Sequence, residues 1–395
     1  MTIASRRGQA CADNARGEGM RFVTRRKPRT ILLGAAAAAA MAVAVPASAY
    51  AAAKTSPVVG HVYVNDNTAG TNTIAVFDRH ADGALTPHAG SPCAAGGAGT
   101  GAGLASQGAL QISPGGRFLI AVDGGSNQLS VLRILPGGSV KPVPGGATSS
   151  GGVLPVSVAI NGDLVYVANA GTGGSNYAGF RLHPNGRLAP IADSTVALPN
   201  NAQPGDVLFN STGRKLVGAR VGTSQIDSFT VAANGHLTAA PHSPFPAQGL
   251  GPFGSEFRPT NPRQLFVSNA HNTGTGTGTV SAFRDSPNGT LTSIGHSPFA
   301  DHQTAPCWVE ITHNGRFLFT VNTAAGTVSR YSIARTGALR LLGSTPIRGT
   351  TTIGAVDARL SPGGRYLYVD ESKTAAVAAF AVHGGNLTEL AKSPA

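Results

Sequence analysis

Apolar positions repeat along the chain with a period of about fifty residues, from about residue 60 to the end. Most repeat units begin with an apolar strand that ends in Asn or Asp, such as residues 62–65 and 265–269. A second strand follows, in which an apolar residue stands three positions before an aromatic residue or Leu. The seven pairs are Ile74/Phe77, Leu129/Leu132, Tyr177/Phe180, Ile226/Phe229, Val280/Phe283, Val328/Tyr331 and Val377/Phe380. Their second members lie 55, 48, 49, 54, 48 and 49 residues apart, so the units align along the whole body of the chain.

A tight turn follows the second strand of every unit. Glycine stands there in all seven units, at Gly83, Gly138, Gly186, Gly235, Gly289, Gly337 and Gly385. Glycine readily adopts the positive φ that tight hairpins require. A third strand then ends in Ser-Pro in several units, and a fourth strand leads into the next unit. Four short strands in each of seven units predict an all-β fold, a seven-bladed β-propeller of four-stranded antiparallel blades.

The first unit is the irregular one. Six inner strands are clear, but only residues 54–59 precede the first repeat, and the chain ends at Ala395 directly after the third strand of the last repeat. Propellers often close the ring by pairing strands from both termini, and that device looks missing here. We therefore expect the first blade to be incomplete or weakly completed.

The first fifty residues have the layout of a secretory signal peptide. Arg25, Arg26 and Lys27 precede an apolar run over residues 31–45, and Ala47-Ser48-Ala49 is a small-x-small cleavage site. The apolar run is shorter than the ~20 residues that span a membrane. We expect residues 1–53 to be a leader cleaved near Ala49, and residues 54–395 to be the propeller. The protein is then secreted, by Sec or twin-arginine export, with no stable membrane span after cleavage.

Composition supports this fold and excludes other classes. The 395 residues include 53 Gly and 26 Pro, which disfavour helical bundles. The formal net charge is +12, and half of it belongs to the leader, where eight Arg and Lys oppose two acidic residues. The basic residues of the body are scattered singly. Nucleic-acid binding needs a concentrated basic surface, so we expect none.

Acidic residues are scarce, yet several stand on the inner strands that would surround the central channel. Strand register places four polar residues at one level, and three more residues two positions earlier. The first level holds Gln111, Glu256, Glu310 and Arg359, and the second holds Asp206, Trp308 and Asp357. Neighbouring carboxylates raise each other's pKa, which suits a base or acid near neutral pH. The pattern indicates a hydrolytic or ligand-binding channel mouth, or else a hydrogen-bonded ring that satisfies inner-strand amides.

The repeats themselves resemble a known family. The segments SPGGRFLIAVDGGSNQLSVLRILPGG and THNGRFLFTVNTAAGTVSRYSIARTGALRLL are similar to the lactonase family of seven-bladed propellers. That family includes bacterial 6-phosphogluconolactonase and fungal carboxy-muconate lactonising enzyme, and the resemblance covers about residues 60–395. It implies Arg, His and Glu side chains around one channel mouth. This chain departs there, because Gly251-Pro252-Phe253-Gly254 stands where the bacterial enzymes read Gly-Pro-Arg-His, and Pro204-Gly205-Asp206 lacks another His. The departures disfavour a sugar-phosphate substrate.

Two functions follow from these patterns. The first is an exported lactonase-like hydrolase that opens a small cyclic ester, with Glu256 or Glu310 as base and Arg359 as oxyanion or carboxylate partner. Its substrate would be a lactone or sugar-acid-like molecule, and it would act as a monomer. The residues expected to bind substrate are Gln111, Asp206, Trp308 and Asp357. The second is a non-catalytic propeller that binds a ligand or a protein partner through its loop-rich rim.

No cofactor is expected from the sequence. It shows no His/Cys spacing typical of a metal site, and a carboxylate ring could hold Ca²⁺ without a defined ligand set. Cys93 and Cys307 could form a disulfide or remain separate thiols. Residues 92–107, nearly all Ala, Gly and Ser, could form a flexible lid over the channel or a slack connection.

Overall fold

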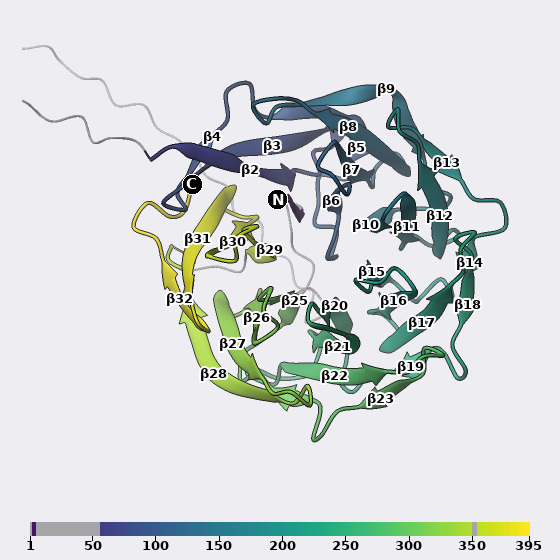
Figure 1. The fold of residues 1–395 in the computed structure, drawn as a ribbon, viewed down its shortest axis with the longest axis vertical. Helices are drawn as coiled ribbons and strands as arrows, with labels where there is room; N and C mark the ends of the chain where they lie inside the picture. The colour runs from purple at the N-terminus through teal and green to yellow at the C-terminus, as the bar shows by residue number, and fades with distance from the viewer. Residues whose placement is uncertain (1, 5–55, 350–353) are drawn as a thin grey trace, which may run out of the picture.

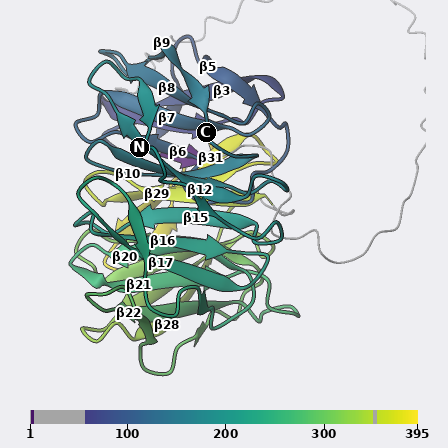
Figure 2. The same cartoon turned by 90° about the vertical axis from the view of Figure 1, so that its right-hand side faces the viewer.

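The computed structural model describes residues 2–4, 56–349 and 354–395. Seven sheets follow one another around a central axis, and the last blade lies beside the first (Figure 1). The predicted seven-bladed β-propeller is thus confirmed. The side view shows the blades stacked around the ring with their strands running across it (Figure 2).

In each blade the first strand is the innermost, and from the second blade to the seventh the strands form an antiparallel meander. The first three blades contain β1 (Thr2–Ala4), β2 (Val58–Asn65), β3 (Gly70–His80), β4 (Leu85–Pro87) and β5 (Cys93–Gly99); β6 (Leu110–Ile112), β7 (Phe118–Asp123), β8 (Gln128–Ile134) and β9 (Val140–Ser149); and β10 (Pro155–Asn161), β11 (Leu164–Asn169), β12 (Asn176–Leu182), β13 (Leu188–Pro190) and β14 (Val196–Ala197). The fourth and fifth contain β15 (Pro204–Phe209), β16 (Lys215–Arg220), β17 (Gln225–Val231), β18 (Leu237–Ala239) and β19 (Phe245–Pro246); and β20 (Pro252–Arg258), β21 (Asn261–Asn269), β22 (Thr279–Asp285), β23 (Leu291–Ser293) and β24 (Phe299–Ala300). The last two contain β25 (Pro306–Ile311), β26 (Phe317–Asn322), β27 (Thr327–Ile333) and β28 (Leu339–Pro346); and β29 (Ala355–Leu360), β30 (Tyr366–Glu371), β31 (Ala376–His383) and β32 (Asn386–Glu389).

The outer strand is split into two short strands in four blades, and both halves pair with the same neighbour. Where the outer strand is interrupted, a serine hydroxyl takes the place of a backbone carbonyl as acceptor for an amide of the neighbouring strand. Ser91 Oγ accepts from the Val76 amide over 2.8 Å, and Ser243 Oγ accepts from the Ser228 amide over 3.0 Å. The serine of each Ser-Pro motif therefore has a structural role, because a buried amide without a partner would be costly.

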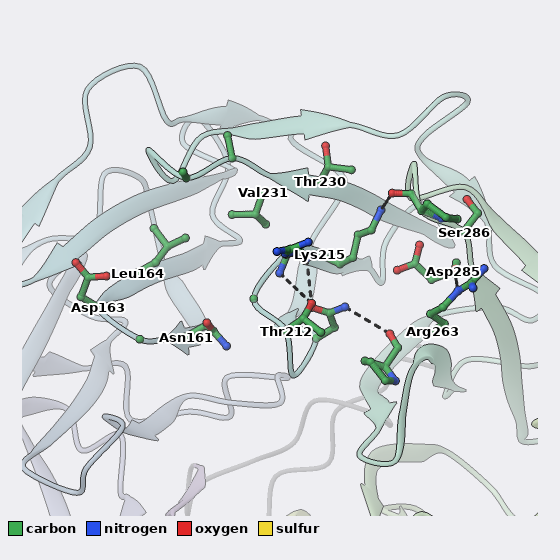
Figure 3. Close-up of a pocket in the computed structure, with 18 of the residues that line it drawn as sticks. Asn161, Asp163, Leu164, Thr212, Lys215, Thr230, Val231, Arg263, Asp285 and Ser286 are labelled. Atoms are coloured by element: carbon green, nitrogen blue, oxygen red, sulfur yellow. Dashed lines mark hydrogen bonds between the residues drawn. The ribbon is translucent and has the colours of Figure 1, made fainter.

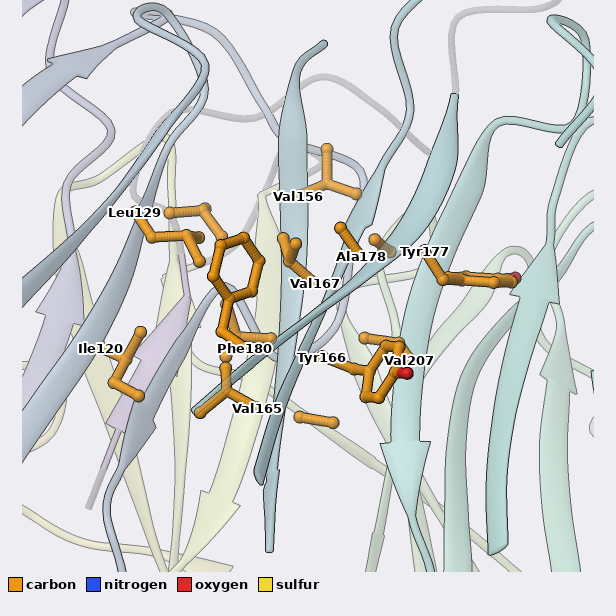
Figure 4. Close-up of a cluster of buried hydrophobic side chains, with 14 of the residues drawn as sticks. Ile120, Leu129, Val156, Val165, Tyr166, Val167, Tyr177, Ala178, Phe180 and Val207 are labelled. Atoms are coloured by element: carbon orange, nitrogen blue, oxygen red, sulfur yellow. The ribbon is translucent and has the colours of Figure 1, made fainter. Parts of the chain in front are cut away.

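The hydrophobic core lies between the blades. In the largest cluster, Ile120 and Leu129 of the second blade pack against Val165 and Phe180 of the third, and Tyr166 packs towards Val207 of the fourth (Figure 4). All fourteen residues of the seven repeated pairs are buried, none more than 5% exposed. Each sheet buries both faces against its neighbours, which explains why apolar residues occupy successive strand positions.

The first blade is completed weakly, as the sequence predicts. Its innermost position holds only the three residues of β1, which pair with β2 in parallel, whereas the other innermost strands pair antiparallel. Apart from Thr2–Ala4, the predicted leader over residues 1–53 lies outside the described residues. Side chains close the ring from the last blade, because Tyr366 and Tyr368 donate their hydroxyls to the carbonyls of Ala81 and Gly83 in the first.

Two further expectations concern the cysteines and the membrane. Cys93 carries a free thiol, so no disulfide joins it to Cys307. No helix in the described part of the chain is long and apolar enough to cross a membrane.

Candidate active site

Strand pairing places the four polar residues of the first predicted level at equivalent positions of four blades. Each stands opposite the residue that follows a fully buried Leu in the neighbouring strand. The pairs are Gln111 with Ile120, Glu256 with Phe266, Glu310 with Phe319, and Arg359 with Tyr368. The fifth, sixth and seventh blades are consecutive, so Glu256, Glu310 and Arg359 come from neighbouring inner strands.

Glu310 and Arg359 form an ion pair across the boundary between the last two blades. Arg359 Nη1 donates to Glu310 Oε2 over 3.2 Å, and the Leu360 amide donates to Glu310 Oε1 over 3.2 Å. The Glu310 side chain is 9% exposed and that of Arg359 is 24% exposed. The pair is therefore largely buried, and Arg359 is its more exposed member.

Glu256 completes the cluster as a carboxyl group that favours its protonated form. Burial raises the pKa of Glu256 to about 8, with a further rise from Glu310 and an opposing effect from Arg359. Burial also raises the pKa of Glu310, while Arg359 and the Leu360 amide act to lower it. The pKa of each carboxyl group is thus above its ordinary value, and that of Glu256 is high enough to favour the protonated form at neutral pH.

Asp206 lies in a hydrogen-bond network between inner strands. It accepts from the amide and the hydroxyl of Ser255 and from the hydroxyl of Ser157. Burial raises the pKa of Asp206 to about 7, although the bonds from Ser255 act to lower it. Asp206 thus links the third, fourth and fifth blades through its oxygens. Asp357 is 1% exposed and contributes negative charge near Arg359.

Trp308 anchors a loop that crosses the channel. Its indole donates to the Ser106 carbonyl over 3.0 Å. Next in the loop, Gln107 donates from Nε2 to the Ser255 carbonyl over 2.8 Å and accepts from the Val309 amide over 3.0 Å. The Gln107 amide also donates to the Gly205 carbonyl over 2.9 Å. Residues 104–108, here called the plug, therefore bridge from the second blade to the fourth, fifth and sixth at the start of the inner strands.

The plug lies at the point where this chain carries Phe253-Gly254 and the family motif carries Arg-His. A Cβ atom at Gly254 would lie 2.2 Å from Oε1 of Gln107, so only glycine leaves room for that side chain. The preceding Phe253 is fully buried and packs edge-on against Trp308, with ring centroids 5.2 Å apart. Phe253-Gly254 thus seats the plug where the family motif would carry Arg-His. Of residues 92–107, the first part forms β5 and the last part the plug.

Gln111 is the remaining predicted site residue. It is half-buried on β6, next to the plug, and a Cβ atom at Gly108 would lie 3.2 Å from its Nε2. The structure therefore brings together Glu256, Glu310 and Arg359 with Asp206 and Asp357 nearby, whereas Trp308 serves the plug.

A cavity of about 850 Å³ lies elsewhere, between the third, fourth and fifth blades (Figure 3). Arg181, Lys215 and Arg263 line it, together with Asp163 and Asp285. Arg181 pairs with Asp163 over 2.8 Å. Burial raises the pKa of Asp285 to about 6, against the opposing charges of Lys215 and Arg263. The sequence does not reveal this cavity, because its basic residues are scattered over three blades and only Arg214 and Lys215 are adjacent in the chain.

The sequence also fails to reveal a cluster of His61, Asp78 and His88 on the first blade. Their spacings of 17 and 10 residues match no compact metal motif. The available signal is the repeat itself, since none of the other six blades carries His or Asp at the positions equivalent to His61 and Asp78.

Comparison with known proteins supports the fold and the resemblance. A family model described as "Lactonase, 7-bladed beta-propeller" matches residues 257–352, which fall mainly on the fifth and sixth blades. The resemblance to the lactonase family is confirmed. Among curated protein sequences, none matches the chain.

Solved structures of similar shape cover most of the lactonase-like body. The periplasmic gluconolactonase of Pseudomonas aeruginosa has 20% sequence identity and a TM-score of 0.65, covering 86% of this chain and 96% of its own. A Bacteroides fragilis protein assigned as a 6-phosphogluconolactonase has 21% identity and a TM-score of 0.65, covering 85% and 93%. A Bacteroides uniformis protein with the same assignment has 20% identity and a TM-score of 0.63, covering 81% and 91%. At these identities the likeness shows the fold alone.

Proposed function

We propose that this lactonase-like propeller hydrolyses a small cyclic ester at the cluster of Glu256, Glu310 and Arg359. The observation that carries the proposal is the geometry of this cluster: one guanidinium, one carboxylate paired with it and one carboxyl group that keeps its proton. Lactone opening needs a base for water, a cation for the developing oxyanion and an acid for the leaving ring oxygen. The three side chains supply these three groups.

The reaction can be written with each residue in one role. Glu310 takes a proton from a water molecule as the water oxygen bonds to the lactone carbonyl carbon. Arg359 stabilises the negative charge that forms on the carbonyl oxygen. When the carbonyl re-forms, the ring C–O bond breaks and Glu256 gives its proton to the leaving oxygen. The product is a hydroxy acid. The proton that Glu310 took from water then returns to Glu256, which restores the starting state of the site.

The plug bears on the class of substrate. It lies at the start of the inner strands that carry the cluster, bonded to Ser255 and Val309, and Phe253-Gly254 provides no cation there. We therefore propose a compact, unphosphorylated lactone that reaches the cluster through the channel from the other mouth, with Gln111 beside the plug as a substrate contact. Export through the predicted leader fits this proposal, and a structurally similar protein is named a periplasmic gluconolactonase.

The test is pH-stat hydrolysis by the purified chain against aldonolactones, muconolactones and simple γ-lactones. Glu256→Gln, Glu310→Gln and Arg359→Met are each expected to lower kcat/KM at least 100-fold, a loss typical of removing a general acid–base group or an oxyanion donor. Asp193→Asn, which changes an exposed carboxylate outside the channel, is the matched control. Full activity in the three cluster variants, with the fold retained by circular dichroism, would refute the assignment.

The alternative is a non-catalytic propeller that binds an anionic ligand. The cavity between the third and fifth blades favours it, because Arg181, Lys215 and Arg263 line a space large enough for a small molecule. Absence of hydrolysis with every lactone, together with saturable binding of an anionic ligand that Arg263→Ala abolishes, would establish this second function.

A further inference from the structure

Three side chains of the first blade converge on one point outside the channel. His61 on β2 stands directly opposite Asp78 on β3, and His88 follows β4 in the same sheet. Nδ1 of His61 lies 3.1 Å from Oδ1 of Asp78, and Nδ1 of His88 lies 2.7 Å from the same oxygen. One potential ligand atom from each residue lies within 4.8 Å of the others.

The scaffold holds these atoms firmly. His61 and Asp78 belong to paired strands, and the His88 amide donates to the Val76 carbonyl over 3.0 Å. The other ring nitrogen of His88, Nε2, lies 2.8 Å from the hydroxyl of Ser139 in the second blade. Metal-binding histidines typically use their second nitrogen in this way, which fixes the tautomer and the ring orientation.

The second blade covers the cluster without filling it. Gly138 lies against the His61 ring so closely that a Cβ atom there would come within 2.3 Å of three ring atoms. The side chains of His61, Asp78 and His88 keep 19%, 24% and 14% of their surface exposed. An ion can therefore enter from solvent, and water can complete its coordination.

We propose that His61, Asp78 and His88 bind a divalent transition-metal ion of the zinc class. Two imidazole nitrogens and one carboxylate oxygen are typical ligands of Zn²⁺, which binds them at about 2.0–2.2 Å in tetrahedral sites that can keep water as the fourth ligand. Ligand atoms in such a site stand about 3.3 Å apart, so the two nitrogen–oxygen distances of 3.1 and 2.7 Å need only small adjustments. Ca²⁺ and Mg²⁺ prefer six or more oxygen ligands, which this cluster does not provide.

The site would join β2, β3 and the segment after β4, and Ser139 would connect it to the second blade. β1, the innermost strand of the first blade, is short and pairs in parallel, so an ion here would add a cross-link to that sheet. The blade positions equivalent to His61 and Asp78 carry Phe118 and Arg133 in the second blade, for example. The cluster is thus not part of the repeated propeller pattern.

The test uses the untagged chain after treatment with a chelator. Isothermal titration with ZnCl₂ is expected to show one tight site per chain, and ZnCl₂ but not MgCl₂ or CaCl₂ is expected to raise Tm. Asp78→Asn and His88→Gln should each weaken Zn²⁺ binding at least tenfold. His80→Gln is the matched control, because His80 lies on β3 two residues beyond Asp78 and its nitrogens contact Ser56 and Thr86 instead. Equal Zn²⁺ affinity in wild type, Asp78→Asn and His88→Gln would overturn the proposal.

A second measurement avoids substitutions that could prevent folding. Diethyl pyrocarbonate modifies accessible neutral histidines, and peptide mapping locates the modified residues. Zn²⁺ is expected to protect His61 and His88 of the wild-type chain at least fivefold, while leaving His80 unprotected. Equal modification of His61 and His88 with and without Zn²⁺ would refute the site.

Discussion

Arg359 on the seventh blade donates a hydrogen bond to Glu310 on the sixth, with 3.2 Å between Nη1 and Oε2. This bond joins two inner strands and also orients the only guanidinium of the candidate site. Burial alone would lower the pKa of Arg359, but Glu310, Asp357, Glu256 and Asp206 together raise it above its ordinary value. The ion pair therefore has a structural and a chemical role, and the two can be separated by substitution.

We predict that Glu310→Gln destabilises the protein by about 1–3 kcal/mol, because it removes a charge-assisted hydrogen bond from a largely buried pair. The same change removes a negative charge that raises the pKa of Glu256, so that pKa should fall. Urea denaturation measures the first effect, and carboxyl ¹³C NMR titration measures the second. An unchanged Glu256 titration would show that the two carboxyl groups do not interact.

A second prediction concerns stability and pH. Glu256 and Asp206 have pKa values of about 8 and 7 in the folded protein, well above those of an unfolded chain. The folded state then binds more protons than the unfolded state, so these groups contribute stability at acid pH that is lost as pH rises from about 4 to 8. Each contributes at most about 1.4 kcal/mol per pH unit.

The difference between wild type and the Asp206→Asn, Glu256→Gln double variant isolates this contribution. We expect the free energy of unfolding of the wild type, relative to the variant, to decline between pH 5 and pH 8. Denaturation at one-unit intervals measures it, and the comparison cancels the effect of other titrating groups. A pH-independent difference would mean that both carboxyl groups ionise normally in the folded protein.

The sequence predicts the fold and the level of the acidic residues for the same reason. Strand alternation has a period of two, and the seven repeats supply the register, so Glu256, Glu310 and Arg359 can be aligned without coordinates. The plug could not be predicted, because residues 92–107 have no periodic pattern and the side-chain bonds of Gln107 go to partners more than 140 positions away in two blades. Loop contacts of this kind depend on three-dimensional closure of the ring.

The histidine cluster could be predicted from the sequence only in part. The repeat register aligns His61 with Asp78, since they stand next to Val62 and Phe77, which form the adjacent buried pair. His88 lies beyond β4, in a segment where unit lengths differ, so its approach to Asp78 does not follow from spacing. Likewise, sequence could not decide whether Cys93 and Cys307 meet, because that depends on the distance between the first and sixth blades.

A third prediction tests the plug. Gln107→Ala removes the acceptor of the buried Val309 amide and the donor to the buried Ser255 carbonyl. We expect a loss of about 2–4 kcal/mol, since each unsatisfied buried group costs roughly 1–3 kcal/mol. Denaturation checks the energy, and limited proteolysis near residues 100–108 checks whether the loop leaves the channel. Gln128→Ala, at a half-buried position on β8, is the control, and equal stability of the two variants would contradict the role of the plug.

A fourth prediction compares two adjacent glycines with positive φ. Gly137 has φ +88° with no atom within 4 Å of an added Cβ, whereas Gly138 has φ +97° and contacts the His61 ring. Gly137→Ala should cost about 1 kcal/mol from backbone strain. Gly138→Ala should cost at least twice as much, because it also displaces His61. Thermal denaturation measures the loss of stability in each variant, and the difference between the two losses is the steric contribution of the His61 ring. Equal losses would show that the ring moves aside freely.

The boundary between the seventh and first blades has a consequence for how the molecule opens. Elsewhere the chain passes covalently from each blade to the next. Here the two blades meet through apolar packing, such as Val62 and Phe77 with Val377, and through bonds from Tyr366 and Tyr368 to two carbonyls. In a repeat protein each unit is stabilised by its nearest neighbours, so fluctuations begin where one neighbour is held least firmly. Amide hydrogen exchange should therefore be fastest among buried strands in β2, β3 and β31, and should slow progressively towards the fourth blade.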